Sequence, residues 1–132
     1  LFWWGVRVKS ATEDRAEVTI PYTWRTQNPF KSVYFAAQAG AAELSTGVLV
    51  IAAIRGQSRT VSMLVTHFEA AYTKKADDTI TFTCTDGPEI FAAVERAVNL
   101  DTPQTVVAET VGTMPGGMEV SRVRVTWSLR AR

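Results

Sequence analysis

Alternating apolar and polar residues in several short segments of the chain predict a β-sheet. The clearest case is residues 79 to 85, where threonines alternate with Ile80, Phe82 and Cys84. This period of two places the apolar side chains on one face of a strand. Less regular alternation predicts further strands at about residues 3 to 10, 15 to 22, 58 to 74, 104 to 113 and 118 to 130.

Between these strands, residues from about 32 to 48 predict a long helix, for which Ser32 is a suitable N-cap. Glu43 is the only charged residue between Lys31 and Arg55, and a helix that is apolar on nearly every side is typical of a buried one. A shorter amphipathic helix is predicted over about residues 89 to 99, after Pro88. The order of elements predicts an α+β domain in which an antiparallel sheet curls around the long helix.

The length and charge of the chain exclude some classes of protein. A chain of 132 residues suits one domain, 1–132. Its 14 basic residues are scattered and balanced by 13 acidic ones, so nucleic acid is not an expected partner. The apolar stretch from 32 to 54 is long enough to cross a bilayer, but Gln38, Glu43 and Gly47 interrupt it, so no membrane partner is expected either.

The first residues and the single cysteine bear on the cellular location expected for the protein. The chain begins at Leu1 without Met, and its first four residues lack the basic leader and the length of a signal peptide, so a trimmed start is expected. Cys84 has no second cysteine to pair with, and its strand position predicts a small buried side chain. A reduced, cytoplasmic location is compatible with this usage.

The segment from Asn28 to Glu43 resembles the central motif of the acyl-CoA thioesterases with a hotdog fold. That motif has Asn-x-x-Gly-Thr-Val-His-Gly-Gly, then six residues, then Asp or Glu; this chain has Asn-Pro-Phe-Lys-Ser-Val-Tyr-Phe-Ala, six residues, and Glu43. Residues 69 to 79 are similar to the family's Asp-Phe-Leu-Arg-Pro-Ala segment. The element order matches over nearly the whole chain, closest to the thioesterase branch that includes the C-terminal domain of YiiD. The resemblance implies a hotdog fold.

The resemblance also implies catalytic roles for two residues. Glu43 would act as general base or as nucleophile on a thioester carbonyl, and a carboxylate on an apolar helix needs a partner or a cavity. The alternative is a structural carboxylate, hydrogen-bonded to the partner helix or to Arg25. Asn28 would position the carbonyl or the attacking water, or else it only closes its loop.

Substrate contacts are implied at the start of the long helix. Tyr34, Phe35 and Ala36 stand where the family has His-Gly-Gly, so their backbone amides would polarise the carbonyl, although Phe35 is bulky. Gln38 and Thr46, together with Ser45, lie near Glu43 on adjacent turns and are secondary candidates. Lys74 is a candidate for the phosphates of coenzyme A, as are Lys75, Arg122 and Arg124.

The remaining polar residues suggest no other chemistry. His67 is the only histidine, and with one cysteine it cannot make a His and Cys zinc site, so no metal or cofactor is expected. The expected partners are acyl-CoA or another acyl thioester, and a second copy of the chain in a homodimer or tetramer. Two alternatives stay open: a non-catalytic module that binds acyl chains or acyl-CoA, and a structural dimerisation domain.

Overall fold

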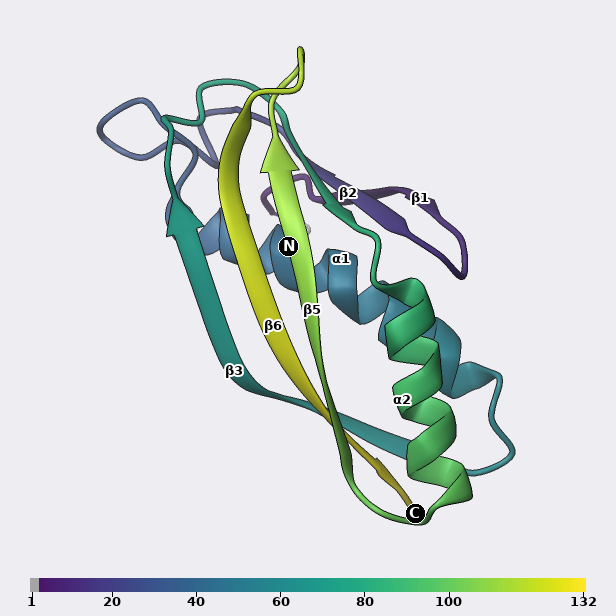
Figure 1. Ribbon diagram of the computed structural model, residues 1–132. Coiled ribbons are helices and arrows are strands. Elements are labelled where there is room, and N and C mark those ends of the chain that lie inside the picture. The colour runs from purple at the N-terminus through teal and green to yellow at the C-terminus, as the bar shows by residue number, and fades with distance from the viewer. Residues whose placement is uncertain (1–2) are drawn as a thin grey trace.

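Six antiparallel strands form a single curved sheet in the computed structural model, which describes residues 3–132 (Figure 1). The strands are β1 (Arg7–Ala11), β2 (Ala16–Ile20), β3 (Val61–Tyr72), β4 (Ile80–Cys84), β5 (Gln104–Thr113) and β6 (Glu119–Ala131), in the order β1-β2-β4-β5-β6-β3. The helices are α1 (Phe35–Arg55) and α2 (Gly87–Asn99). The element order and the α+β class predicted from the sequence are therefore confirmed.

Helix α1 crosses one face of the sheet, behind β3, β6 and β5 in the view of Figure 1. It packs against β2, β4 and β5, and α2 lies beside it, against β5. By length and composition alone α1 could cross a membrane, but more than half of that stretch is buried inside the protein. The sheet accounts for the apolar residues on the buried side of α1.

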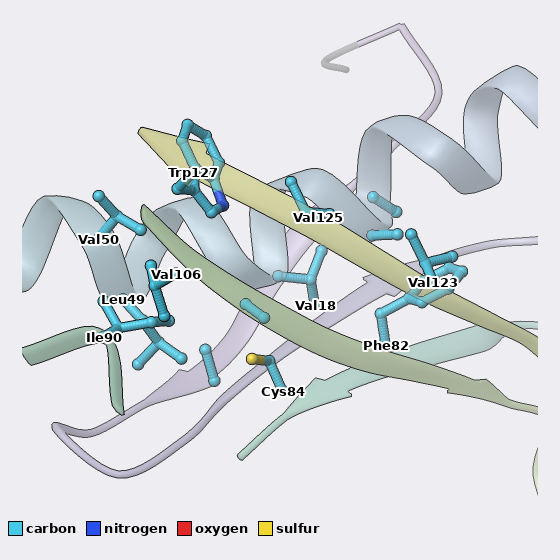
Figure 2. Packing of buried hydrophobic residues seen from close by; sticks show 14 of the residues in the cluster. Val18, Leu49, Val50, Phe82, Cys84, Ile90, Val106, Val123, Val125 and Trp127 are labelled. Atoms are coloured by element: carbon cyan, nitrogen blue, oxygen red, sulfur yellow. The ribbon is translucent and has the colours of Figure 1, made fainter. Parts of the chain in front are cut away.

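Inward-facing side chains of the strands make the core together with the two helices. Figure 2 shows Val123, Val125 and Trp127 of β6 directed toward the helix, with Phe82 of β4 and Val18 of β2 completing the layer. All five are at most 4% exposed. The alternation seen in the sequence is thus the alternation between the core face and the outer face of the sheet.

The cysteine lies in this core, as its strand position predicted. Cys84 is completely buried, and burial raises the pKa of its thiol to about 11. The thiol is therefore protonated and shielded from reagents at neutral pH.

The predicted bounds of the long helix were wrong at both ends. Ser32 is not the N-cap: its hydroxyl accepts a hydrogen bond from the Ala76 backbone N–H (3.0 Å), and Val33 is held in an extended bridge with Gln27. The helix therefore begins only at Phe35. It continues to Arg55 because its last turns are packed into the core, and this packing outweighs the weak helix propensity of its Val and Ile residues.

The first hairpin is shorter than predicted. Its strands are β1 and β2, with Arg7 rather than residue 3 at the start, because Gly5 adopts a left-handed turn conformation (φ +73°) before it. All five residues of β1 are exposed, so this strand is an outer edge of the sheet.

The other edge of the sheet is the long strand β3, which pairs with β6 alone. The register of its pairing with β6 shifts between Val65 and His67. Leu64 on this strand is 65% exposed and Phe68 is 37% exposed. A long, apolar edge of this kind is seldom left bare in a folded protein.

Candidate active site

A groove runs along α1 on the side that faces β3. Its floor is a stripe of helix residues spaced three or four apart, which places them on one face of the helix. Most of them are small: Ala36, Ala39, Gly40, Glu43, Leu44, Gly47 and Ile51. The wall is made by Met63, Val65 and Phe68 of β3, Trp127 of β6 and Trp4 of the N-terminal segment.

The groove consists of two hollows that share Gly40 and Glu43. The hollow toward the start of α1 has a volume of about 450 Å³ and reaches Ala36 and Trp4. The hollow toward the end of α1 has a volume of about 190 Å³ and reaches Ile51 and Trp127. Glu43 thus stands at the middle of the groove, and it is the only charged residue that lines either hollow.

Glu43 is not the buried carboxylate that an all-apolar helix predicted. Its side chain is exposed, because the small residues around it leave α1 uncovered on this side. Within residues 3–132 it makes neither an ion pair nor a side-chain hydrogen bond, and Arg25 instead packs on the rings of Trp3 and Trp24. In the part of the chain that the structure describes, the carboxylate therefore has no bonded partner and faces the groove and solvent.

The start of α1 leaves backbone donors free at one end of the groove. Tyr34 is the N-cap residue and provides no side-chain hydrogen bond to the first turn. The first N–H groups of a helix have no acceptor within the helix, and they carry the positive end of its dipole. Since Ala36 lines the larger hollow, this turn is next to the space in which Glu43 lies.

The bulky residues at the helix start pack on each other. The ring of Phe35 meets the rings of Tyr34 and Tyr72 edge-on, at centroid distances of 5.2 and 6.3 Å. The Tyr72 hydroxyl donates a hydrogen bond to the Phe35 carbonyl oxygen (3.2 Å), and burial raises the pKa of this tyrosine. Neither Tyr34 nor Phe35 lines a hollow, so their bulk does not fill the groove.

Asn28 has a structural role in the loop before α1. Its side-chain oxygen accepts hydrogen bonds from the backbone N–H groups of Phe30 (2.9 Å) and Ser32 (3.1 Å). Lys31 at the centre of this loop has a φ of +60°, a conformation that such bonds help to hold. These hydrogen bonds support the interpretation that Asn28 closes its loop.

Three other predicted residues lie away from the groove surface. Gln38 is 4% exposed, and its amide donates to the Val33 carbonyl oxygen (3.1 Å). Thr46 is buried and donates its hydroxyl to the Glu43 carbonyl oxygen (2.9 Å). Lys74 is exposed in the turn after β3 and lines neither hollow.

Several groove residues were not predicted from the sequence. Gly40 and Gly47 lie one turn before and one turn after Glu43, and this small-residue spacing around a lone carboxylate is a signal that the sequence contains. Met63 and Trp127 carried no such signal, because their place beside α1 depends on how distant strands pair. Within residues 3–132, no group of three His, Cys, Asp or Glu side chains is placed to hold a metal ion.

Solved structures share this fold. PA5026 from Pseudomonas aeruginosa, named as a protein of unknown function and probable thioesterase, has a TM-score of 0.85 at 19% identity, covering 98% of this chain and 85% of that one. A protein of unknown function from Chlorobaculum tepidum has a TM-score of 0.84 at 13% identity, covering 99% and 85%. Thioesterase HI1161 from Haemophilus influenzae has a TM-score of 0.72 at 17% identity, covering 98% and 81%.

These similarities confirm that the chain has the hotdog fold, as its resemblance to that superfamily implied. Residues 4–129 match the family described as a domain of unknown function, DUF4442, so the chain belongs to this family. No curated protein sequence matches it significantly.

Proposed function

We propose that this protein hydrolyses acyl thioesters, with acyl-CoA as the substrate, in the groove between α1 and β3. The observation that carries the proposal is the position of Glu43, a carboxylate in the middle of an otherwise uncharged groove whose one end reaches the uncapped start of α1. The thioesterase names of structurally similar proteins support the same reaction class.

The helix places the two catalytic elements at a suitable separation. Glu43 follows Ala36 by seven residues, which is nearly two full turns, so both lie on the groove side about 10 Å apart along the helix axis. A glutamate side chain leans toward the helix start, which shortens this separation. In this proposal the thioester carbonyl lies against the first-turn amides and a water molecule lies against the carboxylate, so we assign Glu43 the role of general base.

The reaction follows from this arrangement. Glu43 accepts a proton from water while the oxygen of that water bonds to the carbonyl carbon. The carbonyl oxygen becomes an oxyanion, which the N–H groups at the start of α1 stabilise. The tetrahedral intermediate then breaks its C–S bond, and the thiolate takes the proton from Glu43, so that the products are a carboxylic acid and a free thiol. Lys74, exposed after β3 and outside both hollows, is proposed to contact the phosphates of the coenzyme.

We further propose that two copies of the chain pair through β3. This strand is twelve residues long, pairs on one side only within the described residues, and exposes Leu64 and Phe68. Pairing with a second β3 would satisfy its free backbone groups and cover these side chains. Because Phe68 also lines the larger hollow, the second copy would wall the groove.

The activity is tested by following thiol release from a panel of acyl-CoAs. Wild type is compared with Glu43→Ala, Glu43→Gln and the control Glu95→Gln, which alters an exposed glutamate on α2 outside the groove. We expect turnover by wild type and the control, and a loss of about a hundredfold or more in both Glu43 variants. Equal melting temperatures would show that the loss is chemical.

Two other outcomes would contradict the proposal. Hydrolysis that survives in both Glu43 variants would remove this residue from the mechanism. No hydrolysis of any acyl-CoA, together with a ligand-induced rise in melting temperature, would establish a binding module instead.

The pairing is tested separately by light scattering coupled to gel filtration. Leu64→Lys on β3 is compared with Val107→Lys on β5, since both replace an exposed apolar side chain on a strand. Leu64→Lys is expected to yield monomers, whereas Val107→Lys is expected to keep the wild-type mass. A wild-type monomer at high concentration would refute pairing.

A further inference from the structure

The smaller hollow of the groove has the properties of a site for an apolar group. It extends from Glu43 toward the end of α1, and its other lining residues carry no charge: Gly40, Leu44, Gly47, Ile51, Met63 and Trp127. A group bound in this hollow would lie next to Glu43, so it would be part of the same molecule that reacts at this carboxylate. The apolar part of a thioester that reacts at Glu43 is its acyl chain.

One wall of the hollow is a side chain that is held in place. Trp127 is 4% exposed, and its indole N–H donates a hydrogen bond to the Thr46 hydroxyl (2.9 Å). Turning the ring away would leave a buried indole N–H without an acceptor, which proteins rarely tolerate. This wall of the hollow is therefore fixed rather than adaptable.

The width of the hollow also depends on Gly47. A Cβ atom at this position would stand 3.5 and 3.6 Å from two ring atoms of Trp127, which is ordinary van der Waals contact. A methyl group there can be accommodated without displacing the backbone, but it would occupy part of the space between helix and ring. The absence of a side chain at Gly47 thus contributes to the width of the hollow.

The volume sets the size of the group that fits. A protein cavity of about 150 Å³ lined by apolar side chains holds one benzene molecule. At about 190 Å³ the hollow beside Glu43 is slightly larger, and unlike that cavity it is partly open to solvent. Resting on the hydrolase function proposed above, we infer that it binds the acyl part of the substrate and selects a group about the size of one aromatic ring or a chain of about six carbons. Gly47 and Trp127 set this limit.

The inference is tested by the dependence of kcat/KM on acyl size. The panel is acetyl-, butanoyl-, hexanoyl-, phenylacetyl-, decanoyl- and palmitoyl-CoA. Wild type is expected to prefer hexanoyl- and phenylacetyl-CoA, with a fall of about tenfold or more for palmitoyl-CoA, because a single methylene in an apolar pocket already changes kcat/KM by about tenfold or more.

Two variants should shift this preference in opposite directions. Gly47→Ala narrows the hollow and is expected to move the optimum to butanoyl-CoA. Trp127→Phe removes part of the ring that walls the hollow and is expected to move the optimum to decanoyl-CoA. The control is Gly56→Ala, the same substitution after the end of α1, where an added Cβ would lie 3.7 Å from the Ala53 carbonyl oxygen and outside the groove. It should leave the profile unchanged.

The results separate this inference from the proposed function. A preference that is flat, or that neither variant shifts, overturns the size limit while hydrolysis itself stands. If no thioester is cleaved, the hydrolase proposal fails, and the hollow is then tested with the non-hydrolysable thioethers S-hexyl-CoA and S-hexadecyl-CoA. If S-hexyl-CoA raises the melting temperature of wild type but not of Gly47→Ala, the hollow is a binding site of limited size. Equal stabilisation by both thioethers would refute the size limit.

Discussion

The same substitution, Gly to Ala, is expected to change stability in opposite directions in the two helices. Gly47 lies in the interior of α1, where glycine is less favourable than alanine by about 1 kcal/mol. Its added Cβ would meet only the ring of Trp127, at 3.5 Å or more. Gly47→Ala should therefore raise the free energy of unfolding by about 1 kcal/mol, which for 132 residues is a rise in melting temperature of about 3–4 °C.

Gly87, the first residue of α2, has no such space. Its N–H donates to the Asp14 carbonyl oxygen (3.1 Å), so the backbone of α2 lies against the turn between β1 and β2. An added Cβ would come within 2.6 Å of the carbonyl carbon and oxygen of Asp14 and would also collide with the carbonyl oxygen of Glu13. These are backbone atoms that no side-chain rotation can move. Gly87→Ala should lower stability by about 1–3 kcal/mol or more.

The pair is measured by differential scanning calorimetry and urea unfolding under the same conditions. Replacing glycine by alanine lowers the conformational entropy of the unfolded chain by a similar amount at both positions. The difference in stability between the two variants therefore reports on the folded structure. Melting temperatures that move in the same direction would refute the reasoning. A fall for Gly47→Ala would show that α1 and Trp127 are closer than described, and a rise for Gly87→Ala would show that α2 does not lie against the turn.

Two further predictions concern buried polar groups. Thr46→Val leaves the Trp127 indole N–H without its acceptor and should lower the free energy of unfolding in urea by about 1–3 kcal/mol. Thr46→Ser keeps a hydroxyl acceptor and should retain most of that stability. Equal losses in the two variants would contradict the hydrogen bond. Because burial raises the pKa of Cys84 to about 11, its thiol ionises first in the unfolded chain. Its contribution to stability should thus be complete below about pH 9 and decrease as the pH rises toward 11. Cys84→Ala should lack this decrease, and identical pH profiles would contradict it.

The strands could be predicted from the sequence because their signal is local. Residues 104 to 113 and 118 to 130 were placed within one residue of β5 and β6, since period-two alternation survives wherever one face of a strand is buried. The bounds of α1 could not be predicted in the same way. Its start is displaced by contacts of Ser32 and Val33 with Ala76, more than forty residues away. Its end lies beyond residues of low helix propensity, which the core nevertheless keeps helical.

The candidate site was predictable only in part. Glu43 could be singled out because a lone charge in a long apolar helix needs an explanation. Its burial was predicted wrongly, since composition does not show which side of a helix a sheet will cover. Trp127, which walls the smaller hollow, lies eighty-one residues from its hydrogen-bond partner Thr46, and no spacing rule connects them. The structure was needed to bring them together.

The missing amphipathic pattern of α1 follows from its two environments. One side of the helix is buried by the sheet and must be apolar, and it carries residues such as Leu49 and Val50. The opposite side forms the groove, and it is apolar too, but built from small residues such as Gly40 and Gly47 that leave room beside them. Hydropathy treats both sides alike, whereas side-chain volume separates them. In this fold, therefore, the size of the residues on either side of Glu43 marks the groove more clearly than their polarity does.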